Sequence, residues 1–440
     1  MATAGTQKQT PPERNLYLDA LRAGALLVVV FGHWIATLPR FDGDVVIETE
    51  HLLKVWESAG FLTWVVQVVP LFVFVSAAVS ADGVARRMEQ GHRQLHWWGS
   101  RALGLARPTV TYLAAIAVLG LISVYTGGRL LEPFNQSLTI HLWFLIMLLS
   151  VQALLPVSVA ADRRWGLGAV VGLVVAAALV DLLRAMPTSI ADVLRLGQRV
   201  TESGVGIGWL NMLLVWLLPQ QLGIAWRRGR FRGAWAGLAF LVLGAAWLSA
   251  TVASGYPVGM VGRDFHGDSN MLPPTLALAG VMWLQVGAVL FFERPGRWLL
   301  DRRRISGAVG MLSALSMPLY LWHKLAELPA AWLGERLGLP VDAGLPGEAG
   351  FWIGRLWWLG FCTLMVIPVI AAVVAFEMRR TRNVVQATNT PAILIGGFLL
   401  FAGIVVSLAL GALPGALIGV AGVAAASWVL RAHPQPPRAK

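Results

Sequence analysis

The chain has 440 residues, of which 57% are hydrophobic and only 13% are charged, and its formal net charge is +12. These proportions exclude an ordinary soluble protein and favour an integral membrane protein. The basic residues occur in short clusters between apolar stretches, as membrane topology requires, so no nucleic-acid partner is expected. The single cysteine, Cys362, lies in an apolar stretch, and the sequence therefore offers no disulfide framework.

Apolar stretches of roughly 20 residues, long enough to cross about 30 Å of hydrocarbon, recur along the chain. They predict an all-α fold, a polytopic transmembrane helix bundle that crosses the cell membrane many times. Twelve spans are expected, near residues 16–38, 60–81, 108–126, 140–160, 166–184, 209–226, 234–252, 273–292, 305–326, 351–376, 391–411 and 413–431. The polar segments 1–13 and 433–440 are predicted to be disordered cytoplasmic tails. A short interfacial helix is expected around residues 190–200.

Charge alternates between the connections of these spans. Lys and Arg gather in alternate segments, above all 82–107 and 293–304, while acidic residues gather in the others, as in the connection that holds Asp42, Asp44 and Glu48. Cytoplasmic loops are enriched in Lys and Arg, so the pattern predicts that both termini are cytoplasmic.

The first span carries three ionisable residues, Asp19, Arg22 and His33. Such residues are costly inside a membrane and are candidates for function. Eleven residues separate Arg22 from His33, which places them about 20° apart on one helix face and about 16 Å apart along its axis. In the alternative interpretation, Arg22 pairs with Asp19 and extends towards the cytoplasm, while His33 lies at the membrane interface without a catalytic role.

Two further histidines are expected at the depth of His33. His141 begins the fourth span from the outer side, and His323 ends the ninth span on that side. Each histidine alone is more often a hydrogen-bonded or interfacial residue than a catalyst. Three imidazoles could hold zinc, but no carboxylate lies at a supporting spacing, so we expect no metal.

On the cytoplasmic side, Arg101 and Arg107 follow Trp97 and Trp98. Arginine binds phosphate oxygens with two hydrogen bonds, and tryptophan covers a flat ring, which together suit a nucleotide-bearing donor such as acyl-CoA. The alternative is an amphipathic segment that contacts anionic lipid head groups.

Several motifs resemble those of the acyltransferase 3 family of integral membrane O-acyltransferases. The stretch from Tyr17-Leu-Asp-Ala-Leu-Arg22 to Phe31-Gly-His33 resembles the first helix of the family, with its Arg-x10-His motif. The other similar stretches are Pro70-Leu-Phe-Val-Phe-Val-Ser76, His141-Leu-Trp143-Phe-Leu145, Leu319-Tyr320-Leu-Trp-His323 and Phe376-Glu377. The segment Arg101-Ala-Leu-Gly-Leu-Ala-Arg107 departs from the Arg-x-x-Arg motif of the family, which weakens its assignment to donor binding.

The resemblance implies a membrane acyltransferase domain over residues 14–380, of ten helices, followed by two additional transmembrane helices in 381–432. It implies transfer of an acyl group, most often acetyl, from acyl-CoA to a hydroxyl of a glycan or other sugar-containing acceptor. His33 and Arg22 are then the expected catalytic residues. The expected supporting residues are Asp19, Ser76, His141, Trp143, Tyr320 and His323. Membrane lipids are the other expected partners, and a secondary transporter is the alternative function.

Overall fold

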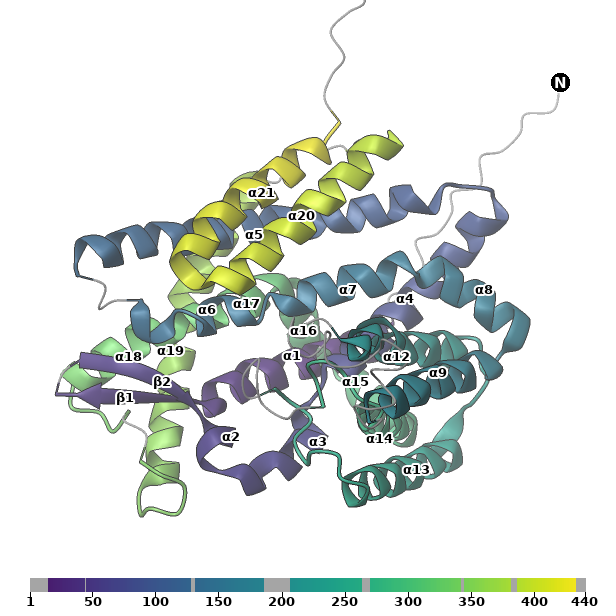
Figure 1. Cartoon of the computed structure of the whole chain (residues 1–440), viewed down its shortest axis with the longest axis horizontal. Helices are drawn as coiled ribbons and strands as arrows, with labels where there is room; N and C mark the ends of the chain where they lie inside the picture. Colours follow the sequence, from purple (N-terminus) through teal and green to yellow (C-terminus); the bar gives the residue numbers. More distant parts are fainter. Residues whose placement is uncertain are drawn as a thin grey trace, which may run out of the picture.

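The computed structural model describes residues 15–43, 45–127, 131–185, 206–262, 270–341, 344–380 and 386–432. Within these ranges the chain is a bundle of helices with one two-stranded antiparallel sheet (Figure 1). The predicted all-α membrane fold is therefore confirmed. The predicted tails and the interfacial helix expected around residues 190–200 lie outside the described residues.

The first half of the chain begins with helix α1 (Leu16–Ala36), which packs against α4 (Val69–Glu89) and against α16 (Arg303–Ala314) of the second half. The elements of the first half are α1 (Leu16–Ala36), β1 (Thr37–Asp42), β2 (Val45–His51), α2 (Leu52–Val55), the 3-10 helix η1 (Glu57–Leu62), α3 (Thr63–Val66), α4 (Val69–Glu89), α5 (Gln94–Tyr125), η2 (Glu132–Phe134), α6 (Ser137–Ile140), α7 (Trp143–Ala153), α8 (Leu155–Trp165) and α9 (Gly168–Arg184).

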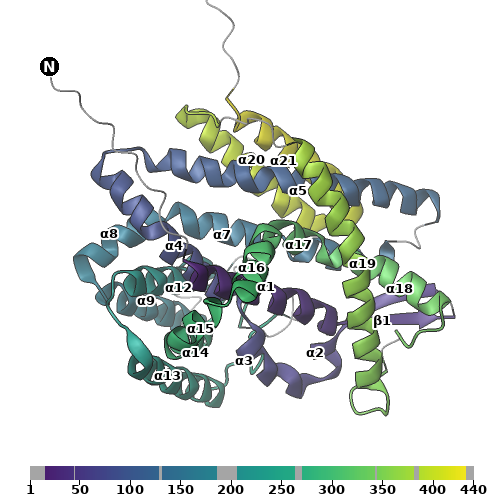
Figure 2. The ribbon, with the colours of Figure 1, turned by 180° about the vertical axis from the view of Figure 1, so that it is seen from behind.

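The second half completes the bundle. Its elements are η3 (Ile207–Leu210), α12 (Asn211–Arg227), α13 (Gly233–Ala253), α14 (Leu278–Phe291), α15 (Glu293–Leu300), α16 (Arg303–Ala314), α17 (Ser316–Trp322), η4 (His323–Ala326), α18 (Glu327–Arg336), α19 (Phe351–Arg380), α20 (Thr390–Leu410), the π-helical segment η5 (Gly411–Gly415) and α21 (Ala416–Val429). Figure 2 shows α15 to α19 from behind, with α16 and α17 close to α1.

Helix α1 begins and ends at residues with identifiable roles. The side chain of Asn15 accepts hydrogen bonds from the backbone N–H groups of Tyr17 and Leu18, which caps the first turn. At Thr37 the backbone becomes extended, and strand β1 pairs with β2, so that Thr37 lies opposite His51. This hairpin was not predicted, because an acidic outer loop was expected after residue 38. Its short strands have no clear alternation, and their pairing therefore depends on tertiary contacts.

By length and apolar composition, the described residues hold fewer candidate spans than the predicted twelve. Among the described residues, eight helices are long and apolar enough to cross a membrane, or up to ten if two bent helix pairs are each counted as one span. Helix α14, at the predicted span 273–292, has only 14 residues. The two predicted C-terminal spans fall in one 40-residue apolar stretch, Thr390–Val429, in which α20 and α21 pack against each other. Hydropathy windows could not distinguish these short or joined helices from separate full-length spans.

Glycines allow close helix packing inside the bundle. A Cβ atom on Gly237 of α13 would lie 2.6 Å from the Phe291 nitrogen, and one on Gly244 would lie 2.8 Å from the Gly280 oxygen of α14. In lipid, helices associate through such close backbone approach rather than through hydrophobic burial. The pair α13 and α14 is accordingly one of the most closely packed in the molecule.

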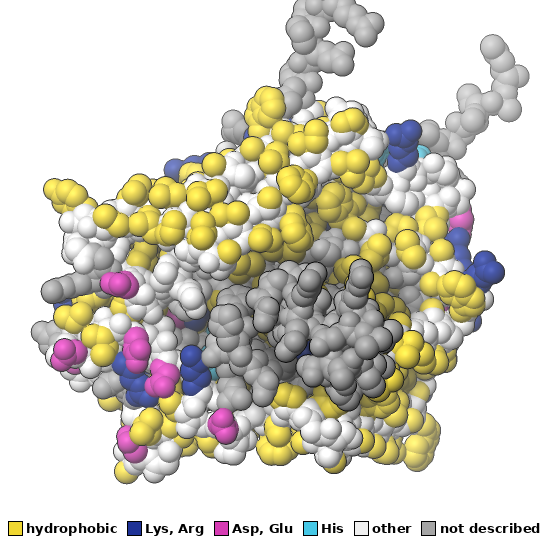
Figure 3. Space-filling model, viewed as in Figure 1, with side chains coloured by type: hydrophobic (Ala, Val, Ile, Leu, Met, Phe, Trp, Pro, Cys, Tyr) yellow, Lys and Arg dark blue, Asp and Glu magenta, His cyan; other side chains and the backbone are white. Residues whose placement is uncertain are grey.

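Helices α20 and α21 lie along α5 at one side of the bundle (Figures 1 and 2). Gly99 and Gly120 of α5 face side chains of the C-terminal segment, namely Ile393 and Leu413. The division into an acyltransferase domain over 14–380 and two additional helices in 381–432 stays a prediction. Apolar side chains cover the surface of this region in Figure 3, as a lipid-facing surface requires.

Candidate active site

His33 and His323 form a direct hydrogen bond, although 290 positions separate them in the sequence. Nδ1 of His33 lies 2.8 Å from Nε2 of His323, and the two rings are within 13° of a common plane. His33 belongs to the last turns of α1, and His323 begins η4 where α17 ends. The sequence predicted only a shared membrane depth for these two histidines, and the structure brings their rings into direct contact.

The surroundings of His323 define which nitrogen carries the proton. Its Nδ1 lies 2.7 Å from the carbonyl oxygen of Tyr320 and 3.2 Å from that of Leu319. Carbonyl oxygens only accept hydrogen bonds, so Nδ1 of His323 must be the protonated nitrogen. In a neutral ring, Nε2 of His323 then accepts, and Nδ1 of His33 donates. The lone pair of His33 is consequently left on Nε2, the nitrogen that a general base needs.

His141 completes a group of three imidazoles. Its ring centre lies 5.4 Å from that of His323, and it is 2% exposed. The Tyr320 hydroxyl donates a hydrogen bond to the backbone oxygen of His141, which holds this residue at the end of α6, just before α7. Within the described residues, neither ring nitrogen of His141 reaches full hydrogen-bond geometry, although the backbone of Leu321 is close enough to interact with the ring. A buried polar group in this state can receive a hydrogen bond from, or donate one to, a bound substrate.

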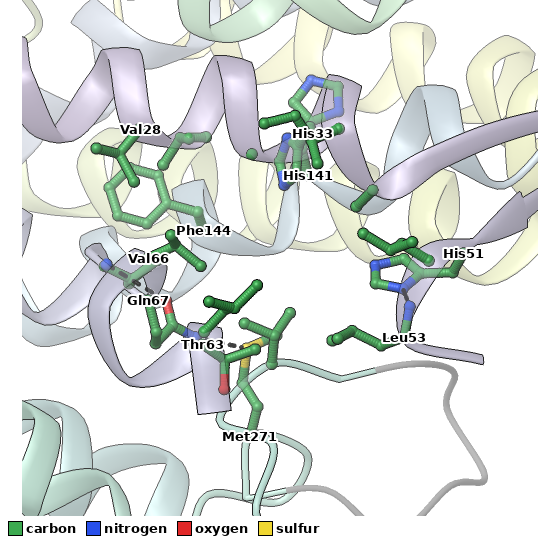
Figure 4. A pocket seen from close by; sticks show the side chains of 18 of the residues that line it. Val28, His33, His51, Leu53, Thr63, Val66, Gln67, His141, Phe144 and Met271 are labelled. Atoms are coloured by element: carbon green, nitrogen blue, oxygen red, sulfur yellow. Dashed lines mark hydrogen bonds between the residues drawn. The ribbon is translucent and has the colours of Figure 1, made fainter. Parts of the chain in front are cut away.

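A cavity of about 280 Å³ adjoins the histidines (Figure 4). His33 and His141 lie next to each other at one edge of it, and Trp143 and Tyr320 also line it. His51, the last residue of β2, lines another part of the cavity wall. His323 is fully buried and lies behind His33. The imidazoles of His33, His141 and His51 therefore line the cavity, whereas that of His323 does not.

The wall opposite α1 is held by hydrogen bonds to a connection between α13 and α14. The side-chain amide of Gln67 donates to the Met260 oxygen at 3.0 Å, and the indole of Trp64 donates to the Val258 oxygen at 2.9 Å. Thr63 accepts a hydrogen bond from the backbone N–H of Met260 at 2.7 Å. These contacts fix α3 against the connection and give the cavity a defined shape.

The same connection is anchored at its start by Tyr256 and Asp181. The Tyr256 hydroxyl lies 3.1 Å from Oδ2 of Asp181, which also accepts from the Leu276 N–H at 2.7 Å. Burial, together with the Asp181 carboxylate, raises the pKa of Tyr256 to about 12. The phenol therefore stays protonated and remains a donor across the physiological pH range.

A buried charge network supports the end of α1 beside His33. Nζ of Lys324 lies 2.7 Å from Oε1 of Glu327, and their side chains are 5% and 0% exposed. The Thr37 hydroxyl accepts from Lys324 at 2.9 Å and lies 2.9 Å from the His33 carbonyl oxygen. Arg355 of α19 donates to the Thr37 carbonyl oxygen at 2.7 Å. Thr37, the residue that follows α1, is thus joined to η4, α18 and α19.

At the other end of α1, Arg22 forms a partly exposed ion pair instead of a buried network. Nη2 of Arg22 lies 3.0 Å from Oδ1 of Asp19, and the Arg22 side chain is 38% exposed. Arg101 of α5 is close enough to Arg22 for electrostatic repulsion, and it lies over the Trp97 ring at 5.4 Å. Arg107 is half-buried on the same helix. Cationic groups from α1 and α5 therefore gather at this end.

The predicted site residues fall into two groups in space. His33, His141, Trp143, Tyr320 and His323 are together at the cavity. The remaining predicted residues, Asp19, Arg22, Arg101, Arg107 and Ser76, are absent from the described lining of the cavity. The Ser76 hydroxyl accepts a hydrogen bond from the Gln152 side chain at 2.8 Å, so its described contact is structural.

The sequence analysis missed two features of the site. His51 lies in an acidic stretch with no distinguishing motif, and its position at the cavity results from the β-hairpin. Lys324 and Glu327 did carry a signal, since opposite charges three residues apart in an apolar stretch indicate a buried pair. Within the described residues, no group of three or more His, Cys, Asp or Glu side chains is arranged to hold a metal ion.

The described residues form a bundle of membrane helices with a histidine pair beside an internal cavity, which is the architecture of an integral membrane protein with titratable groups in its interior. The model of the family described as Acyltransferase domain matches residues 15–377. The chain therefore belongs to this acyltransferase 3 family, as its motifs predicted, and it is an enzyme that transfers groups other than aminoacyl groups. Searches of the curated proteins and of the solved structures gave no match.

Proposed function

We propose that this acyltransferase, in the cell membrane, moves an acyl group from acyl-CoA to a hydroxyl of a glycan or another sugar-containing acceptor, and that His33 is its general base. The hydrogen bond between His33 and His323 is the observation that carries the proposal. It leaves Nε2 of His33 with a lone pair at the edge of a cavity large enough for a substrate group. The family match supports acyl transfer, whereas it gives no support to the alternative of a transporter.

The reaction follows from this proton arrangement. Nε2 of His33 takes the proton of the acceptor hydroxyl while the hydroxyl oxygen attacks the thioester carbonyl carbon. The carbon–sulfur bond then breaks, and the departing thiolate takes the proton back from His33 to give free CoA. A positioned base of this kind contributes about 10² to 10⁴ to the rate. His141 would contact the reacting thioester group, because its ring lies at the same edge of the cavity.

The arginine end of α1 is the proposed binding site for the donor phosphates. Arg22 is partly accessible, and Arg101 and Arg107 of α5 are the other proposed phosphate ligands. With both termini in the cytoplasm, the donor would reach Arg22 from the cytoplasmic side. Its thioester would extend about 16 Å along α1 to His33, and the acceptor would enter from the outer side.

Transfer of labelled acyl groups by the purified protein tests the role of His33. We expect His33→Ala to lower turnover by about 10² to 10⁴. His92→Ala is the matched control, because His92 is exposed and lies in a turn between α4 and α5, and it should retain normal turnover. A folded His33→Ala protein with near-normal turnover would show that His33 is not the base.

The acceptor can be tested separately in cells. In a strain that lacks the protein, mass spectrometry of the surface glycans should show the loss of an ester mass. Restoring the wild-type chain should restore this ester, and restoring His33→Ala should not. Glycans of unchanged mass in the deletion strain would exclude a surface glycan as the acceptor.

A further inference from the structure

The cavity beside His33 has walls that suit hydrocarbon. Among the described residues that line it, none carries a charge, and most are apolar. The apolar side chains come from α1, α2, η1, α3, α4 and α7, and include Val28, Ile35, Leu53, Val66, Phe72 and Phe144. A substrate group in this space would therefore meet mainly methyl, methylene and aromatic carbon atoms.

Most polar side chains of the wall are occupied by bonds within the protein. Thr63 donates to the Gly60 oxygen and accepts from Met260, while the amide nitrogen of Gln67 donates to the Met260 oxygen. The Tyr320 hydroxyl donates to the His141 oxygen, and Nδ1 of His51 accepts from the Leu53 N–H. The polar groups available to an occupant are therefore concentrated at His33, His141 and the indole N–H of Trp143.

This distribution of polar and apolar groups suits the acyl chain of the donor better than the sugar of the acceptor. A sugar carries several hydroxyl groups, and burying hydroxyls without hydrogen-bond partners is unfavourable. An acyl chain has one polar group, its carbonyl, at the end that reacts. With the carbonyl at His33 and His141, the rest of the chain would lie against the apolar walls, where burial is favourable.

The size of the cavity indicates the length of the chain. An apolar protein cavity of about 150 Å³ holds one benzene molecule, which has six carbon atoms. The cavity beside His33 measures about 280 Å³, so by the same ratio it accommodates about eleven carbon atoms. An acetyl group, with two carbons, would leave most of this space unfilled.

We propose that the cavity is the binding site for a medium-length acyl chain of about six to ten carbons, carried by the acyl-CoA donor. This inference rests on the proposed function, because it assigns the chain to the donor that His33 would act upon. It replaces the expected acetyl group with a longer one. The sugar-containing acceptor then meets His33 from outside the apolar cavity.

Binding of acyl-CoA thioesters to the purified full-length protein in lipid nanodiscs tests the inference. The probes are free CoA and acetyl-, butyryl-, hexanoyl-, octanoyl-, decanoyl- and hexadecanoyl-CoA. We expect Kd to fall by about two- to fourfold for each added methylene up to eight to ten carbons, because each buried methylene adds a similar increment of binding free energy. Hexadecanoyl-CoA should bind more weakly than decanoyl-CoA, because its chain exceeds the cavity.

Two glycines of α1 provide a matched pair of variants. Gly32 lines the cavity, and a Cβ atom built there has no neighbour within 4 Å, so Gly32→Leu would place its side chain in the cavity. Gly24 lies on the same helix, is exposed, and also has open space at Cβ, but it does not line the described cavity. Gly32→Leu should weaken binding of decanoyl-CoA at least tenfold while acetyl-CoA binding changes less than twofold. Gly24→Leu should leave the whole chain-length profile unchanged.

The possible outcomes distinguish a failure of the chain-length inference from a failure of the proposed function. Retained acetyl-CoA binding shows that Gly32→Leu is folded. Affinity that is greatest for acetyl-CoA, or equal for all chains, overturns the inference while acyl-CoA remains the donor. An identical preference for long chains in Gly32→Leu and wild type would show that the chain lies elsewhere. Failure of every thioester, including acetyl-CoA, to bind the wild-type protein would overturn acyl-CoA as the donor and the inference with it.

Discussion

The two ends of α1 hold their ionisable residues in opposite ways. At one end Arg22 pairs with Asp19, three residues earlier on the same helix, and its side chain is 38% exposed. At the other end His33 bonds to His323, 290 residues later, and His323 is fully buried. The first arrangement is local and accessible to water, whereas the second requires α1 and η4 to meet.

This difference fits the two proposed tasks. The Arg22 side chain is 38% exposed beside an Asp19 side chain that is 13% exposed, so the arginine has a side open to the phosphates of an incoming donor. A general base must hold one tautomer and one orientation, which requires a fixed partner. The buried network around Lys324 and Thr37 strengthens this fixed end by tying the residue after α1 to η4 and α19.

The largest effect on stability is expected from breaking that buried network. Glu327→Ala leaves the Lys324 ammonium buried without its carboxylate, which should lower the free energy of unfolding by about 3 to 5 kcal/mol. Chemical denaturation in detergent micelles measures the change. Glu89→Ala is the control, because its partner contact with Arg163 is exposed and should contribute no more than about 1 kcal/mol. An equal decrease in the free energy of unfolding for both variants would show that the buried network at the histidine end of α1 contributes no more stability than a surface ion pair.

A smaller effect, on turnover rather than stability, is expected at His323. His323→Phe removes the acceptor for Nδ1 of His33, so we expect kcat to fall about tenfold to a hundredfold, part of the contribution of a positioned base. His323→Gln keeps an acceptor oxygen and should recover most of the activity. KM for the donor should stay the same in both variants. Equal kcat values for the Phe and Gln variants would mean that the hydrogen bond to His33 does not position the base.

The smallest effect is expected at the arginine end. Arg22→Met should raise KM for acyl-CoA about tenfold with little change in kcat, because a phosphate contact is lost far from the reacting carbonyl. Asp19→Asn removes the competing carboxylate and should change KM less than threefold. Arg164→Met, at an exposed arginine on α8, serves as the charge-matched control. A fall in kcat without a change in KM for Arg22→Met would place Arg22 in the chemical step instead.

Several features of this protein follow from the sequence alone. Composition and apolar runs determined the helical membrane fold, and the motifs around Arg22 and His33 indicated the family. The pairing of Arg22 with Asp19 also follows from local spacing, because residues three apart on a helix are neighbours. The gathering of His33, His141 and His323 was predicted only as a shared depth in the membrane.

Tertiary structure decided the rest of the site. Depth in a membrane does not fix which helix faces which, and the bond from His33 to His323 exists only because α1 packs beside α17 and η4. The β-hairpin that brings His51 to the cavity depends on pairing between segments without a strong strand pattern. Sequence spacing reveals neighbours within a helix, since helix geometry is regular, whereas contacts between helices depend on the packing of side chains from distant segments.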